Sequence, residues 1–361
     1  MSLEFLKKTF IELVAVDSPY GFEEPMIRHF KEALAPYVDE VQETPRGNVV
    51  GIQRGTDPEA PKIALAAHMD QVGFTVFNIG RRGFIRFRKV GGASNRAIQG
   101  QRVRLATEKG SVPGVVGIKP GHVTPPSETN TIPPIEEMYI DVGAWSREEA
   151  EGMGVKVGTP IVFDGEPQEL ANDLISSHAV DDKAGLTVLI AVARALKDEA
   201  LPATVYYIGT VEEEGGLRGA AVALYDLDVD AAVAVDTAPS GWQPDVNLRD
   251  VVYEVGKGAA IHIGEMGRRG GWIYHRRLRD WLIEAAEAEG LPYQSGYQLG
   301  GTDANAMAQT RGGIPATTVG VPRRYSHSPV ETFDLKDMSG LVGILVAALK
   351  KMKPGFRFLR S

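Results

Sequence analysis

Five apolar segments of this chain each lead, directly or within a few residues, to a carboxylate or a histidine. The chemically capable residues that follow them are His68 with Asp70, Asp181 with Asp182, Glu212 to Glu214, Asp236, and His327. In open α/β sheets, ligands bind just beyond the carboxyl ends of the strands. One such strand end would mean little, but five in one chain predict a shared polyanionic site, which indicates bound metal.

A hydrolytic site with two metals holds its cations about 3.5–4 Å apart, where they clamp the attacking and leaving oxygens. The joint positive charge calls for several carboxylates, one of them bridging, and imidazoles complete the coordination while leaving positions open for water and substrate. The residues of this chain that would supply such a set are His68, Asp181, Glu214, Asp236 and His327.

The adjacent Glu213 and Glu214 are expected to differ in role, because neighbouring residues of an extended chain point to opposite sides. One would bind metal, and the other would act as general base on the attacking water. Asp70, two residues beyond His68, projects to the same side as that histidine and is expected to orient its imidazole.

Each of these features also has an ordinary structural explanation. A single Asp or His at a strand end is more often a cap or a solvated residue. The glutamates at 212–214 could form a solvated charge run, and Asp181 and Asp182 could cap the helix that follows them. The metal hypothesis therefore depends on the coincidence of five strand ends. The histidines expected to have no role at the site are His29, His122, His178, His262 and His275.

Alternating helices and strands are needed to bring these strand ends together. Apolar spacing predicts helices over residues 3–16, 23–34, 184–196 and 277–289, and strands over residues 48–52 and 63–67. This alternation predicts an α/β fold with a mostly parallel, helix-flanked sheet.

The pattern changes between residues 74 and 163. Short β-type segments there alternate with Gly and Pro, and only residues 147–153 have a helical pattern. The β-type segments are residues 84–90, 103–106, 115–118 and 138–142. Because the α/β pattern resumes afterwards, we expect a small β-rich domain, residues 73–164, inserted into a catalytic domain formed by residues 1–72 and 165–361.

Composition excludes several classes of function. The chain has 361 residues, a net charge of −8 and no cysteine, so thiolate nucleophiles, zinc fingers and iron–sulfur clusters are impossible. The net negative charge does not indicate the basic surface that binds nucleic acid. The longest apolar stretch, residues 184–193, is half of the roughly 20 residues that span a bilayer, so no membrane partner is expected. No secretory signal pattern begins the chain, and a cytoplasmic location is predicted.

Several motifs of the chain resemble those of the glutamyl, lysyl and tetrahedral (TET-type) aminopeptidases. The three main ones are residues 68–73 (HMDQVG), 180–185 (VDDKAG) and 213–220 (EEGGLRGA). Further matches, in the same order as in the family, are residues 139–144, 235–239, 300–304 and 324–331.

The resemblance implies a set of metal ligands, carried over residue by residue. His68 and Asp236 would bind one cation, and Asp181 would bridge it to the other. Glu214 and His327 would complete the second cation's coordination. The metal would be Zn²⁺ or Co²⁺, because mixed imidazole and carboxylate ligands suit borderline divalent ions.

The resemblance also implies that Glu213 is the general base and that Asp70 supports His68. The peptide bond between Asp181 and Asp182 is expected to be cis, a rare form for a non-proline residue. The fold would be a zinc-aminopeptidase-like α/β domain interrupted by a PDZ-like domain that mediates oligomer contacts. A homo-oligomer of up to twelve subunits is the implied assembly.

The chain departs from the family at four places. Glu212 stands where most relatives have Gln, Gly215 replaces a larger apolar residue, and Asn305 replaces a small one. The Gly- and Arg-rich stretch 264–274 matches nothing in the family pattern. The metal set is intact despite these changes, but the preferred N-terminal residue of the substrate does not follow from it.

The predicted function is a dinuclear metal aminopeptidase that removes N-terminal residues from short peptides. Attack by a metal-bound hydroxide, with Glu213 taking its proton and passing it to the leaving amine, is the expected mechanism. An N-acyl deacylase or a glycan hydrolase on the same scaffold is the alternative, although a glycosidase needs two carboxylates and no metal set. A non-catalytic peptide-binding protein is a further alternative, but it predicts the loss of a ligand or of the base.

Overall fold

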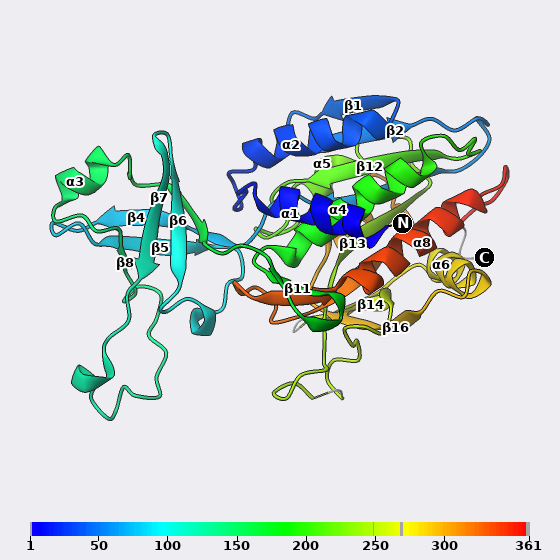
Figure 1. Ribbon diagram of the computed structural model, residues 1–361. Coiled ribbons are helices and arrows are strands. Elements are labelled where there is room, and N and C mark those ends of the chain that lie inside the picture. Colours follow the sequence, from blue (N-terminus) through cyan, green and yellow to red (C-terminus); the bar gives the residue numbers. More distant parts are fainter. Residues whose placement is uncertain (1, 248, 268–269, 359–361) are drawn as a thin grey trace.

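The computed structural model describes residues 2–247, 249–267 and 270–358. Figure 1 shows a large α/β body, which contains both described ends of the chain, and a smaller β body at the left of the view.

Four parallel strands form the centre of the main sheet. In spatial order they are β12 (Thr204–Thr210), β3 (Lys62–His68), β13 (Ala231–Pro239) and β17 (Ala316–Arg324). Their side chains alternate between two cores: Ile63 and Leu65 of β3 face one side, whereas Ala64 and Ala66 face the other. Strands buried on both faces are typical of a parallel sheet covered by helices.

The flanks of this sheet are antiparallel, so the prediction of a mostly parallel sheet is right only for its centre. Beyond β12 lie β2 (Val49–Gln53) and β1 (Glu40–Glu43), and beyond β17 lie β18 (Glu331–Asp334), β11 (Leu174–Ser177) and β10 (Gln168–Glu169). A parallel pair needs a crossover of a dozen or more residues, and the links β1–β2 and β10–β11 are far shorter.

Three further strands extend the sheet beside β17: β14 (Ala259–Gly267), β15 (Gly270–Ile273) and β16 (Tyr293–Leu299). Strand β14 pairs with β17, and β15 and β16 each pair with β14. The unmatched stretch 264–274 lies mostly in β14 and β15, and its Arg268 and Arg269 lie outside the described residues.

Helices cover the two faces of the sheet unequally. One face carries the long helices, which are α1 (Leu3–Val14), α2 (Glu24–Leu34), α4 (Val180–Leu196), α6 (Arg276–Ala288) and α8 (Leu335–Lys350). The opposite face carries the short α5 (Ala220–Ala223) and α7 (Asp303–Met307). The predictions of the four helices are confirmed, and α4 begins four residues earlier than expected. Residues 180–193 of α4 are all buried, which places Asp181 and Asp182 inside the protein.

The smaller body is a closed six-stranded barrel with its own hydrophobic core. Its strands, in spatial order, are β4 (Gly73–Ile79), β5 (Ile85–Val90), β8 (Ile140–Asp141), β7 (Gly110–Val116), β6 (Arg102–Thr107) and β9 (Pro160–Phe163). The ring of Phe74 makes edge-to-face contacts with those of Phe87 and Phe163 in this core. Helix α3 (Arg147–Gly152) lies in this part of the chain, as predicted. These strands fall within the predicted insertion 73–164, whose boundaries and PDZ-like character stay predictions.

Short 3₁₀ turns complete the described elements. They are η1 (Ala35–Tyr37), η2 (Asn95–Ala97), η3 (Gly121–Val123) and η4 (Ala171–Asp173). Within the described ranges, no helix is both long and apolar enough to cross a bilayer.

Candidate metal centre

The predicted site residues meet at the carboxyl edge of the parallel strands. His68 ends β3, directly opposite Thr210 at the end of β12. Asp236 lies two residues beyond Ala234 on β13, and Ala234 pairs with Ala66, so Asp236 is level with His68. Parallel strands in register therefore place segments far apart in the sequence at one edge, as the pattern of strand ends predicts.

The carboxylate of Asp181 lies between the two predicted histidine ligands. Its Oδ1 is 3.2 Å from Nε2 of His68, and its Oδ2 is 3.2 Å from Nε2 of His327. The peptide bond between Asp181 and Asp182 is cis, so that prediction is confirmed. One carboxylate that offers a separate oxygen toward each imidazole has the arrangement of a bridging ligand.

Backbone carbonyls fix which nitrogen of each histidine faces Asp181. Nδ1 of His68 is 3.0 Å from the carbonyl oxygen of Asp70, and Nδ1 of His327 is 3.2 Å from that of Gly92, just beyond barrel strand β5. A carbonyl oxygen only accepts, so in the neutral ring Nδ1 carries the hydrogen and Nε2 keeps a free lone pair. Both imidazoles are therefore prepared to bind a cation through Nε2.

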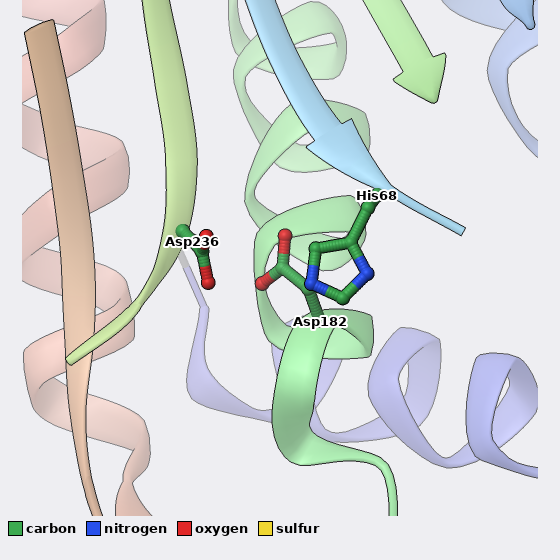
Figure 2. A group of neighbouring side chains, drawn as sticks. All are labelled: His68, Asp182 and Asp236. Carbon is green, nitrogen blue, oxygen red and sulfur yellow. The ribbon is translucent and has the colours of Figure 1, made fainter. Parts of the chain in front are cut away.

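Two groups of side chains are close enough to hold a cation each. The first contains His68, Asp182 and Asp236, whose side chains point toward one another from β3, α4 and β13 (Figure 2). The second contains Asp181, Glu214 and His327. In each group the potential ligand atoms lie within 4.8 Å of one another.

Asp182 is a potential ligand that the sequence analysis did not select. Its Oδ1 accepts a hydrogen bond from the Gly185 amide at 2.9 Å, which is the helix-capping contact considered as the ordinary explanation. Its Oδ2 is buried and has no hydrogen-bond partner among the described residues. The adjacent pair of aspartates was the available signal in the sequence.

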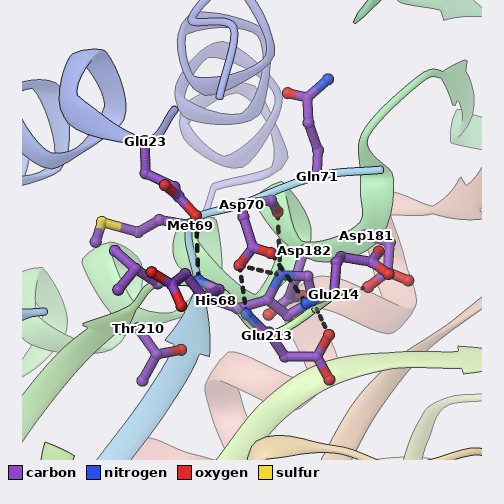
Figure 3. Close-up of polar contacts among 12 residues, drawn as sticks. Glu23, His68, Met69, Asp70, Gln71, Asp181, Asp182, Thr210, Glu213 and Glu214 are labelled. Atoms are coloured by element: carbon purple, nitrogen blue, oxygen red, sulfur yellow. Dashed lines mark hydrogen bonds and ion pairs between the residues drawn. The ribbon is translucent and has the colours of Figure 1, made fainter. Parts of the chain in front are cut away.

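Asp70 holds the two glutamates in place. Its Oδ1 accepts from the amide of Glu213 and its Oδ2 from the amide of Glu214, both at 2.9 Å (Figure 3). Its carboxylate is also 3.5 Å from Nδ1 of His68, farther than its own carbonyl oxygen. Asp70 thus contacts His68 mainly through the main chain, and its side chain orders the glutamate loop.

The three consecutive glutamates separate into three environments. Glu212 forms an ion pair with Arg46, away from both ligand groups. Glu213 places Oε2 4.0 Å from Nε2 of His68, and Glu214 places Oε1 3.5 Å from Nε2 of His327. Glu214 therefore sits among the ligands, and Glu213 lies beside them.

The electrostatics of the site favour the addition of positive charge. Burial and the neighbouring Asp181 raise the pKa of Asp236 to about 8 and that of Glu214 to about 7. Burial likewise raises the pKa of Glu213 well above its usual value. Oε1 of Glu214 is buried without a hydrogen-bond donor in the described part of the chain. Divalent cations would stabilise the charged forms of these buried carboxyl groups, so the residues fit a metal centre.

Two further buried residues of the centre, Arg323 and Glu331, were not selected from the sequence as functional. Arg323 contacts Asp181, and Glu331 accepts hydrogen bonds from the backbone amides of Asp181 and His327. Glu331 ends the matched motif 324–331, which was the available signal, whereas Arg323 stands just before that motif and has no such signal.

The departure at position 215 is explained by Tyr20. A Cβ on Gly215 would lie 2.0 Å from Cε2 of the Tyr20 ring, so the ring fills the space of the missing side chain. The departure at Asn305 has a similar explanation, because its amide Nδ2 donates to the buried carboxylate of Glu265 in β14.

Replacing Gly215 with alanine is expected to destabilise the protein by about 1–3 kcal/mol, because overpacking forces the Tyr20 ring or the glutamate loop to move. Thermal unfolding measures the loss, and the double variant Gly215→Ala, Tyr20→Ala should be more stable than the sum of the single effects predicts. Gly340→Ala is the control, since a Cβ there meets nothing within 4 Å of its helix position. Equal losses for the two glycines would contradict this interpretation.

Comparison with known proteins places the chain in a family. The family profile of the M42 glutamyl aminopeptidases matches residues 47–344. The lysyl aminopeptidase of Pyrococcus furiosus is 33% identical over 353 residues, which cover 97% of each chain. The solved structure of an aminopeptidase from Desulfurococcus kamchatkensis is 35% identical with a TM-score of 0.91, covering 97% of this chain and 96% of that one. The TET1 peptidase of Pyrococcus horikoshii is 29% identical with a TM-score of 0.84, covering 96% and 99%.

The protein is thus a hydrolase of the aminopeptidase class. Within that class, the chain belongs to the M42 glutamyl aminopeptidase family. The resemblance drawn from its motifs is confirmed.

Proposed function

We propose that this aminopeptidase is a dinuclear metal enzyme that removes N-terminal residues from short peptides. The observation that carries the proposal is the position of Asp181, with one oxygen toward His68 and the other toward His327. His68 and Asp236 would hold one cation on the side of Asp181 that faces His68. Glu214 and His327 would hold the other cation on the side that faces His327. Two divalent cations, Zn²⁺ or Co²⁺, would polarise the scissile carbonyl and lower the pKa of water.

Glu213 is the proposed general base. Its carboxylate belongs to neither ligand group, yet it lies beside His68 and its loop is fixed by Asp70. A carboxylate whose pKa is raised by burial can accept a proton from the attacking water and then give it to the leaving amine. Glu213 would serve both steps because its protonated carboxyl group stays within the site and can donate the proton in the second step.

The centre is also suited to a free amino terminus. Four carboxylates of one site are buried or nearly buried: those of Asp181, Glu213, Glu214 and Asp236. A free amine has a lone pair that a bound cation would accept and N–H groups that can donate to Glu213, whereas the nitrogen of an acetylated terminus has no free lone pair.

The proposal is tested with matched peptides that carry a free or an N-acetylated terminus. We expect the free peptides to be cleaved with a kcat/KM at least about 100-fold higher, because acetylation removes the amine lone pair that the centre would bind. A chromogenic panel with acidic, basic and aliphatic first residues would show which N-terminal residue is preferred. Preferential cleavage of the acetylated series would support the N-acyl deacylase alternative instead.

We also propose that the chain forms a homo-oligomer of up to twelve subunits. The TET1 peptidase of P. horikoshii is described as assembling into a tetrahedron or a large octahedral shell, and a structure of that enzyme contains a dodecamer. The mass of the particle in solution decides the number of subunits, and a monomeric mass would contradict the proposal.

A further inference from the structure

Arg323 is a buried cation inside the proposed metal centre. Its side chain is 4% exposed, and each of three nitrogens has a different acceptor. Nε donates to Oγ1 of Thr237 at 2.6 Å, Nη1 donates to Oε1 of Glu331 at 2.9 Å, and Nη2 donates to Oδ2 of Asp181. Because a guanidinium stays protonated in proteins, the centre holds a permanent positive charge of its own.

Glu331 pairs with Arg323 and also accepts hydrogen bonds from the backbone amides of two proposed ligands. Its Oε1 also accepts from the amide of His327 at 2.6 Å, and its Oε2 accepts from the amide of Asp181 at 3.1 Å. The pairing of β18 with β11, which sets Glu331 opposite Ser177, holds the carboxylate there. Arg323 and Glu331 thus orient Asp181 through its side chain and its main chain together.

Arg323 makes its direct contact with the Asp181 oxygen on only one side, that of the Glu214 and His327 group, and it reaches the other oxygen only through the hydroxyl of Thr237. Arg323 and His327 both reach Oδ2 of Asp181, which belongs to the group with Glu214. Oδ1 of Asp181, on the side of His68, receives its other contact from the neutral hydroxyl of Thr237 at 3.1 Å. A cation at the Glu214 and His327 group would therefore share an oxygen with a resident positive charge, and the His68 and Asp236 group would not.

The two ligand groups also differ in solvent exposure, and this difference would likewise weaken binding at the Glu214 and His327 group. The residues of the group with His68 are all buried, whereas the His327 side chain is 30% exposed. Water competes more effectively with protein ligands at the more open position, and like charges repel more strongly in a buried site than in water.

We propose that Arg323 makes the two cation positions unequal, so that the His68 and Asp236 position fills first and the Glu214 and His327 position binds more weakly. This inference deepens the proposed function and rests on it. Arg323 is a positioning residue in this account, since it acts on the metals only through Asp181. In the metal-free chain it also holds the Asp181 carboxylate between the two imidazoles.

A purely structural role for Arg323 makes a different prediction. Breaking a buried ion pair by removing one partner destabilises a protein, because a charge is left unpaired. That effect lowers the unfolding temperature but leaves the ratio of the two metal affinities unchanged. The ratio of affinities is therefore the measurement that separates the two roles.

The test is a titration of the chelator-treated, full-length chain with Co²⁺, followed by calorimetry and by the visible absorption of the bound ion. The wild-type chain should show two phases whose affinities differ about tenfold or more, and His327→Ala should remove only the weaker phase. In Arg323→Met the ratio should fall about tenfold because the weaker position gains affinity, while Arg323→Lys, which keeps the charge, should retain most of the difference.

Arg104→Met is the matched control. Arg104 also joins two aspartates, Asp17 at 2.7 Å and Asp164 at 2.5 Å, but it lies outside both ligand groups. Its replacement should change the unfolding temperature without changing either Co²⁺ phase.

Two equal phases in the wild-type chain would overturn the inference, as would an unchanged ratio in Arg323→Met or loss of the tighter phase in His327→Ala. If Arg323→Met does not fold, the wild-type, His327→Ala and Arg323→Lys titrations still decide, because loss of the difference in Arg323→Lys would show that charge is not its cause. A wild-type chain that binds no Co²⁺ would contradict the proposed function itself, which is a separate outcome from two equal positions.

Discussion

Glu213→Gln is expected to lower kcat by about 100- to 10,000-fold while the protein remains folded and retains its metals. The amide cannot accept the proton of the attacking water, and general acid–base catalysis contributes rate factors of this size. The side chain keeps its shape, and the contact between Asp70 and the Glu213 backbone amide is unaffected by the change. Steady-state kinetics on a free aminoacyl substrate, together with metal analysis of the purified variant, measures the effect.

The neighbouring glutamate supplies a matched control for this experiment. Glu212→Gln makes the same chemical change one residue earlier, where the side chain pairs with Arg46 at the surface. Surface ion pairs contribute about 0–1 kcal/mol, so activity should stay within about twofold of the wild type. If Glu212→Gln abolished activity and Glu213→Gln did not, the assignment of the base would be wrong by one position.

Removal of the metals is expected to abolish peptide hydrolysis and also to lower the unfolding temperature. The carboxyl groups of Asp236 and Glu214 have raised pKa values in the metal-free chain because burial and the neighbouring Asp181 disfavour their charged forms. A ligand present at 100 times its Kd stabilises the folded state by about 2.7 kcal/mol, and two bound cations add their contributions. Activity and stability should therefore fall together on chelation.

Addition of Zn²⁺ or Co²⁺ should restore both properties, and Mg²⁺ should restore them poorly because it prefers ligand sets made of oxygen. Asp181→Asn tests the same idea genetically, since a neutral amide should not bridge two cations and the variant should bind fewer than two. Full activity in the chelated protein would contradict a metal mechanism.

The sequence predicts which residues come together better than it predicts the architecture around them. The parallel centre of the sheet aligns the ends of β3, β12 and β13, and so the apolar segments were sufficient to predict that His68 and Asp236 lie at one edge. Local apolar patterns do not specify strand direction, and the antiparallel flanks therefore did not follow from them. Whether a strand pairs parallel or antiparallel depends on the length of the link to its neighbour.

Two of the residues that the sequence analysis missed contact Asp181 across long separations in the sequence. Arg323 and Glu331 reach Asp181 from strands that are separated from it by more than 140 positions, as the separations of their hydrogen bonds show. The role of Asp182 was hidden because its capping contact to Gly185 explains the residue equally well. Three consecutive glutamates do not by themselves show which of them points away from the ligand groups. The ion pair with Arg46 shows that Glu212 does.

The hydrogen bond between Gly92 and His327 means that the two bodies of the chain share the metal centre. Gly92 follows barrel strand β5, and a Cβ at that position would lie 2.8 Å from the His327 ring, so no larger residue fits without displacing the imidazole. Any rotation of the barrel against the sheet changes the direction in which that ring points. If neighbouring subunits pack through the barrel, a force applied at their junction reaches the His327 imidazole through a single carbonyl group.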